Sequence, residues 1–187
     1  MEVFLVSTGL VAVAEIGDKT QLLAILLAAR FRKPLPILLG ILVATMANHA
    51  LAASLGAVAG TFFEGPWMKW VLGLAFIAFA AWALIPDTFE DKDAPRDRAG
   101  ASIFWTTVVA FFFVEMGDKT QVATAALAAR FQDIAVVAAG TTLGMMLANA
   151  PAVLLGDAAA SRLPLKAIRG AAAASFAALG LWILIWG

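Results

Sequence analysis

The two halves of this 187-residue chain repeat each other at an offset of 100 residues. Residues 15–31 and 115–131 are identical at eleven of seventeen positions, and the offset continues to pairs such as Trp82 and Trp182. Each half holds three apolar segments of about 20 residues, the length that crosses a bilayer. A repeat with an odd number of spans is followed by a copy inserted upside down. We therefore predict an all-α integral membrane protein with six transmembrane helices in two inverted three-helix repeats.

Composition supports a single transmembrane domain over residues 1–187. The chain is 63% hydrophobic with a mean hydropathy of +0.92, and its 14% of charged residues is well below the roughly 25% of soluble domains. Zero net charge argues against nucleic-acid binding, and the absence of cysteine excludes disulfides. We expect repeat one at 1–86, a solvated linker at 87–101 and repeat two at 102–187. The predicted spans are Val3–Ala29, Leu35–Ala59, Trp67–Ile85, Ile103–Ala129, Ile134–Leu155 and Ala167–Trp186.

The first and fourth spans are too long for a straight crossing. At about 1.5 Å per residue each exceeds a hydrocarbon core of roughly 30 Å, so each must tilt or break. Gly17 and Gly117 are the expected break points, because they interrupt the apolar runs within a polar motif.

That motif reads Glu-x-Gly-Asp-Lys-Thr-Gln and occupies residues 15–21 and 115–121. Placing an ionisable side chain inside a bilayer costs free energy, so each such residue is a candidate functional residue. Glu15 and Glu115 each lie twelve residues into their span, or roughly 18 Å, near mid-depth from opposite faces. In a continuous helix Glu15, Asp18 and Lys19 would share one face. Buried ion pairs that merely hold the bundle together are the structural alternative, and a costly one. We predict a single site where the motifs meet.

The residue types favour a hard divalent cation. Carboxylate, amide and hydroxyl oxygens suit Ca²⁺, Mg²⁺ and Mn²⁺, whereas Zn²⁺ or copper would be expected to recruit cysteine and several histidines. Four carboxylates against two lysines leave a formal charge of −2, and burial also favours protonation, so exchange of metal for protons is expected. The predicted metal ligands are Glu15, Asp18, Gln21, Glu115, Asp118 and Gln121. The predicted supporting residues are Lys19, Thr20, Lys119, Thr120, Asn48 and Asn149.

Among the supporting residues, the two lysines are expected to pair with the carboxylates, because an ammonium repels a cation. Asn48 and Asn149 either support the site or form hydrogen bonds between helices. His49 aligns with Asn149, and for His49 the helix–helix role is slightly favoured over a softer metal ligand.

The doubled motif in six short spans resembles the calcium:cation antiporter-2 family over essentially the whole chain, and most of all its bacterial manganese exporters of the MneA type. The resemblance implies export of a divalent cation, Mn²⁺ before Ca²⁺, in exchange for protons by alternating access. It implies that Glu15, Asp18, Glu115 and Asp118 bind the cation, that no cofactor is needed and that the protein is not an enzyme. An intramembrane lipid-phosphate enzyme and a passive cation channel are the alternatives.

The loop charges predict the orientation. Nine of the thirteen basic residues follow the first, third and fifth spans, against two on the opposite side, which places those loops in the cytoplasm and both termini outside. A multi-pass protein of the inner (plasma) membrane is expected, with the lipid bilayer and the metal ion as partners. Homo-oligomerisation is left open.

Overall fold

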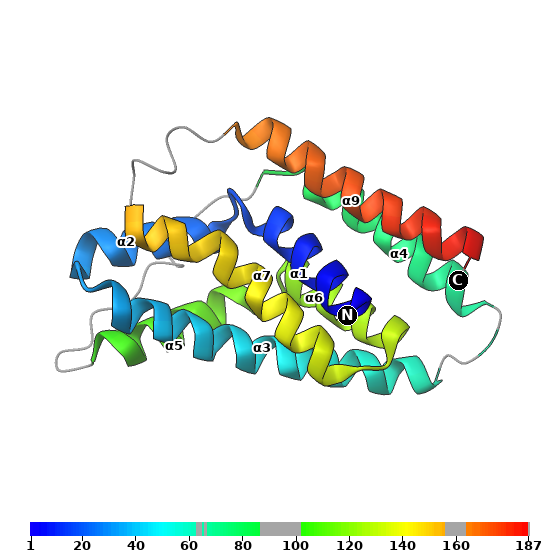
Figure 1. Cartoon of the computed structure of the whole chain (residues 1–187), viewed down its shortest axis with the longest axis horizontal. Helices are drawn as coiled ribbons and strands as arrows, with labels where there is room; N and C mark the ends of the chain where they lie inside the picture. Colours follow the sequence, from blue (N-terminus) through cyan, green and yellow to red (C-terminus); the bar gives the residue numbers. More distant parts are fainter. Residues whose placement is uncertain (63–64, 66, 87–101, 156–163, 187) are drawn as a thin grey trace.

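The computed structural model describes residues 1–62, 65, 67–86, 102–155 and 164–186, and the predicted linker lies outside them. The described residues form eight helices and no strand, which confirms the all-α class (Figure 1). Three of them, α3, α7 and α9, are long and apolar enough to cross a membrane, and α4 and α5 are shorter apolar helices. The helices are α1 (Glu2–Glu15), α2 (Lys19–Phe31), α3 (Pro34–Phe62), α4 (Met68–Ala83), α5 (Ile103–Glu115), α6 (Lys119–Phe131), α7 (Ile134–Leu155) and α9 (Leu165–Trp186).

The first and fourth predicted spans are each broken into two helices at the expected glycines. Gly17 and Gly117 adopt φ values of +85° and +80°, a region that a residue with a Cβ enters only at a cost. The preceding residues, Ile16 and Met116, are extended, so α1 and α5 end and α2 and α6 restart after three residues. The predicted helical face shared by Glu15 and Lys19 is therefore wrong, since the two residues belong to different helices.

Helices of one half pack mainly against helices of the other. α1 lies along α7 and α5 along α3, while α2 contacts α7 and α6 contacts α3. The α4–α9 pair, which stacks Phe76 on Phe176 with ring centroids 6.4 Å apart, lies beside this group. In Figure 1, α3 and α7 run in opposite directions, as do α1 and α5. The two breaks lie close together inside the bundle, since oxygens of Glu15, Glu115 and Asp118, which flank them, lie within 4.8 Å of one another.

Small residues allow this close approach. A Cβ added at Gly40 of α3 would lie 2.9 Å from the Phe104 carbonyl oxygen of α5. One added at Gly140 of α7 would lie 2.9 Å from the Phe4 carbonyl oxygen of α1. The same contact is thus made twice at the offset of 100. Both positions need glycine, because helix backbones this close leave no room for a side chain.

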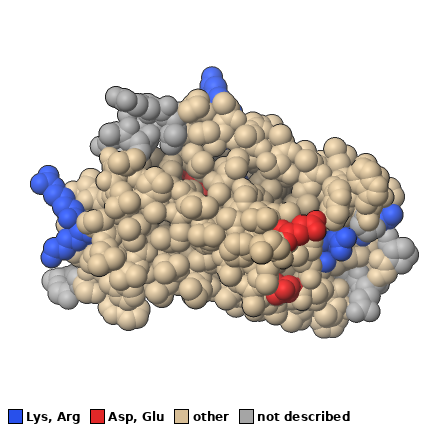
Figure 2. Space-filling model, viewed as in Figure 1, with Lys and Arg blue, Asp and Glu red and all other residues tan. Residues whose placement is uncertain are grey.

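The outer surface is largely apolar. Large hydrophobic side chains such as Leu35, Leu55 and Phe113 are more than 60% exposed. On the face shown in Figure 2, most of the surface between the two ends of the long axis carries no charge. An exposed apolar surface of this extent is typical of a protein that contacts lipid.

Candidate metal site between the two helix breaks

The two motifs form one buried cluster of carboxylates. Glu15 is the last residue of α1, Glu115 is the last residue of α5, and Asp118 immediately precedes α6. One oxygen of each side chain lies within 4.8 Å of the other two. All three side chains are buried, Glu15 completely. The motifs of the two halves therefore meet in one buried cluster, and its role as a cation site stays a prediction.

A threonine orients each glutamate. The Thr20 hydroxyl donates to Glu15 Oε2 at 2.5 Å, and the Thr120 hydroxyl donates to Glu115 Oε1 at 2.7 Å. The second oxygens, Glu15 Oε1 and Glu115 Oε2, are buried without a hydrogen bond in the part of the chain that the structure describes. A buried oxygen that lacks a donor is costly unless a cation or a proton satisfies it.

The lysines pair across the two halves. Lys19 Nζ lies 2.9 Å from Asp118 Oδ1, and Lys119 Nζ lies 3.7 Å from Asp18 Oδ1. Lys119 also donates to the carbonyl oxygen of Ile85 at 3.5 Å. The expectation that the lysines pair with the motif carboxylates is confirmed, and each pair joins one half to the other.

The motif glutamines bind the backbone at the breaks. The amide oxygen of Gln21 accepts from the Gly17 N–H at 2.9 Å, and that of Gln121 accepts from the Gly117 N–H at 2.7 Å. Gln21 also donates to the Ala148 carbonyl at 3.0 Å. These bonds stabilise the turns that hold the carboxylates. A direct role of either glutamine as a metal ligand stays a prediction.

The polar residues of α3 and α7 divide between packing and the site. Asn48 donates to the Phe112 carbonyl at 2.9 Å, a bond between helices at the end of α5. Asn149 donates to the Met145 carbonyl of its own helix at 3.1 Å. His49 was not among the predicted site residues, yet its Nε2 lies 3.6 Å from Glu115 Oε1. The sequence signals for this position were its alignment with Asn149 and the presence of a polar side chain within an apolar span, which left a softer metal ligand as the less favoured alternative.

The helix ends add to the electrostatics of the cluster. The last turn of an α-helix carries unpaired carbonyls and a partial negative charge, so the ends of α1 and α5 favour a cation beside their glutamates. The first turns of α2 and α6 carry partial positive charge and favour the carboxylates of Asp18 and Asp118 at their N-caps. Broken helices that present their ends in this way are a recurrent ion site in transporters.

Comparisons with known proteins agree with this chemistry. A family model described as "Divalent cation/proton antiporter GDT1" matches residues 3–91 and 103–187. A Vibrio cholerae protein named "Putative manganese exporter" is 47% identical over 97% of the chain and 90% of its own length. "GDT1-like protein 5" of Oryza sativa subsp. japonica is 28% identical over 98% of the chain and 94% of its own length. No solved structure gave a significant match. The chain therefore belongs to the GDT1 family of divalent cation/proton antiporters.

Proposed function

We propose that the protein exports Mn²⁺ in exchange for protons, with Ca²⁺ as the second candidate cation. The observation that carries the proposal is the buried cluster of Glu15, Glu115 and Asp118, whose oxygens approach within 4.8 Å. Oxygens at this spacing fit around one divalent ion, because such ions bind oxygen at about 2.0–2.6 Å. Asp18, which precedes α2 as Asp118 precedes α6, is proposed as the fourth carboxylate ligand.

The exchange follows from competition for the same oxygens. A bound divalent cation neutralises two of the buried charges, and two protons do the same when the cation leaves. Lys19 and Lys119 compensate the aspartates in this structure, so the incoming metal has only to displace an ammonium from Asp118 or Asp18. Thr20, Thr120, Gln21 and Gln121 hold the glutamates and the turns in place.

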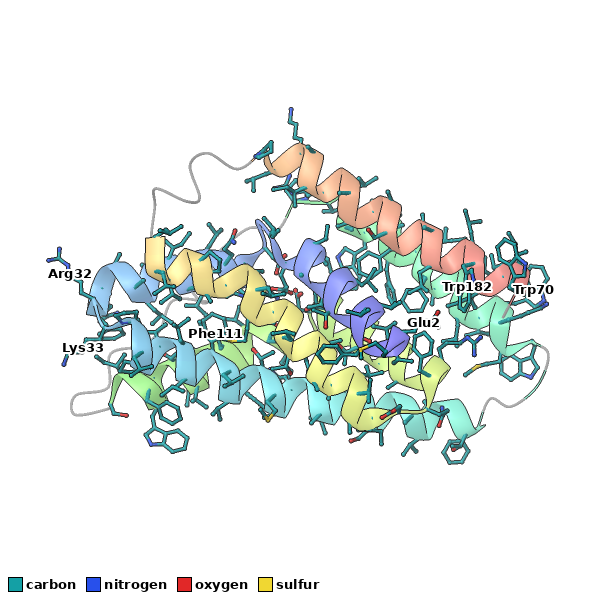
Figure 3. All side chains as sticks on the ribbon, viewed as in Figure 1. Glu2, Arg32, Lys33, Trp70, Phe111 and Trp182 are labelled. Atoms are coloured by element: carbon teal, nitrogen blue, oxygen red, sulfur yellow. The ribbon has the colours of Figure 1, made fainter. Side chains whose placement is uncertain are left out.

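We further propose six membrane spans in one domain, with residues 1–86 and 102–187 as inverted repeats joined by the linker 87–101. The opposite directions of α3 and α7 in Figure 1 support this arrangement. In Figure 3, Arg32 and Lys33 lie at one end of the molecule, and Trp70, Trp182 and Glu2 lie toward the other. Positive residues favour the cytoplasmic side and tryptophans the interface. Both termini would then lie outside the cytoplasm of a plasma-membrane protein, and a homo-oligomer is compatible with the apolar surface.

The test is metal flux in proteoliposomes with and without an imposed pH gradient. We expect the wild type to move Mn²⁺ against an opposing proton flow, and Glu15→Gln and Glu115→Gln to abolish exchange while they remain folded. The control is Glu2→Gln, which neutralises an exposed carboxylate at the opposite end of α1 from Glu15 and should exchange at the wild-type rate.

Two outcomes would refute the mechanism. A metal flux whose rate is the same with and without the pH gradient would identify a passive channel. Exchange at the wild-type rate in either site variant would show that the buried glutamate neither binds the metal nor carries the proton.

A further inference from the structure

One buried side chain beside the carboxylate cluster has no role in the mechanism above. His49 lies in the middle of α3 and is completely buried. Its Nε2 atom lies 3.6 Å from Glu115 Oε1, beyond the length of a normal hydrogen bond. Neither ring nitrogen has a hydrogen-bond partner within the described residues. An imidazole buried in this state costs free energy unless a further partner satisfies it.

The position of the ring suits a cation as that partner. First-row divalent ions hold nitrogen and oxygen ligands at about 2.0–2.3 Å, so two ligands of one ion lie about 3–4.5 Å apart. The 3.6 Å between His49 Nε2 and Glu115 Oε1 falls in this range. The imidazole and the carboxylate can therefore bind the same ion with small side-chain movements.

We propose that His49 supplies a nitrogen ligand to the transported cation and makes the site prefer Mn²⁺ to Ca²⁺ and Mg²⁺. This proposal rests on the proposed cation-binding function of Glu115. Ca²⁺ and Mg²⁺ take oxygen ligands almost exclusively, whereas imidazole is a common ligand of transition metals. One nitrogen ligand among carboxylates thus lowers the affinity of the site for Ca²⁺ and Mg²⁺, whereas Mn²⁺ still binds.

The two halves of the chain differ at this position, so only the first half supplies a nitrogen ligand. The residue aligned with His49 is Asn149, a buried side chain whose Oδ1 lacks a hydrogen-bond partner within the described residues. An amide oxygen suits all three cations. Replacing His49 by asparagine would therefore give both halves the same oxygen chemistry and should relax the selectivity.

The chain contains a single histidine, which makes a spectroscopic test unambiguous. Pulsed electron paramagnetic resonance of Mn²⁺ bound to the full chain, purified without a histidine tag, should show nitrogen hyperfine coupling. The coupling should change when histidine is labelled with ¹⁵N and disappear in His49→Asn. Mn²⁺ that binds the wild type without nitrogen coupling would overturn the proposal.

A binding experiment tests the selectivity. In His49→Asn and His49→Gln the affinity for Mn²⁺ should fall by about tenfold or more, while that for Ca²⁺ should change by less than about threefold. Ser54→Ala is the control, because the Ser54 hydroxyl donates to the Ala50 carbonyl of its own helix, α3, and its loss should leave the Mn²⁺/Ca²⁺ ratio unchanged. An unchanged ratio in both His49 variants would refute the inference.

The same purified protein distinguishes a failure of the His49 proposal from a failure of the proposed cation-binding function on which it rests. If Glu115→Gln abolishes Mn²⁺ binding but the wild type shows no nitrogen coupling, only the role of His49 fails. If Mn²⁺ binds equally well to Glu115→Gln, the carboxylate site fails, and the proposal for His49 fails with it.

Discussion

The ion pairs between the two halves allow a quantitative test. Lys19 and Asp118 lie 2.9 Å apart, with side-chain exposures of 21% and 4%. At an effective dielectric constant of about 20 the gross attraction is about 6 kcal/mol, most of which offsets the cost of removing both charges from water. Lys19→Met leaves Asp118 buried without its cation, and such losses typically cost about 3–5 kcal/mol.

Lys19 keeps 21% of its side chain exposed, so water screens part of the attraction and the lower end of that range applies. Lys19→Met should therefore lower the free energy of unfolding by about 3 kcal/mol.

A double-mutant cycle isolates the pair. Asp118→Asn should cost only about 1 kcal/mol, because the partly exposed Lys19 ammonium can turn toward water. The double variant should then be at least about 2 kcal/mol more stable than the sum of the single losses predicts.

The assay is denaturant-induced unfolding in detergent with a metal chelator, followed by tryptophan fluorescence. Lys33→Met removes an exposed lysine and should stay within about 0.5 kcal/mol of the wild type. Additivity of the two single losses within about 0.5 kcal/mol would refute the reasoning.

Glycine substitutions test the helix packing and the two helix breaks. The stability of each variant is measured as its melting temperature in detergent. Gly56→Ala should cost about 2 kcal/mol, because the new methyl group meets the backbone of α6, whereas Gly9→Ala meets nothing within 4 Å and should be neutral or stabilising. Gly117→Ala should cost about 1–2 kcal/mol for its positive φ, and Gly17→Ala more, since its Cβ would also lie 2.6 Å from Leu165 Cδ2. Equal losses at Gly17 and Gly117, or at Gly56 and Gly9, would contradict these contacts.

The sequence by itself determined the features that depend on local rules. The excess length of the first and fourth spans and the glycine within each motif predicted both helix breaks, because only glycine adopts a positive φ at little cost. Counting residues placed Glu15 and Glu115 at the same depth, and the offset of 100 indicated that both serve one site. These inferences need only the geometry of one chain segment and the thickness of a bilayer.

Only the tertiary structure decided which side chains meet. Helical spacing grouped Lys19 with Glu15, but the break separates them, and Lys19 pairs with Asp118 of the other half. His49 faces Glu115 because α3 packs along α5, a contact between residues 66 positions apart that no local pattern encodes. The physical reason is that a segment's own periodicity fixes which side chains share its face, whereas their partners depend on how α1, α3, α5 and α7 pack together.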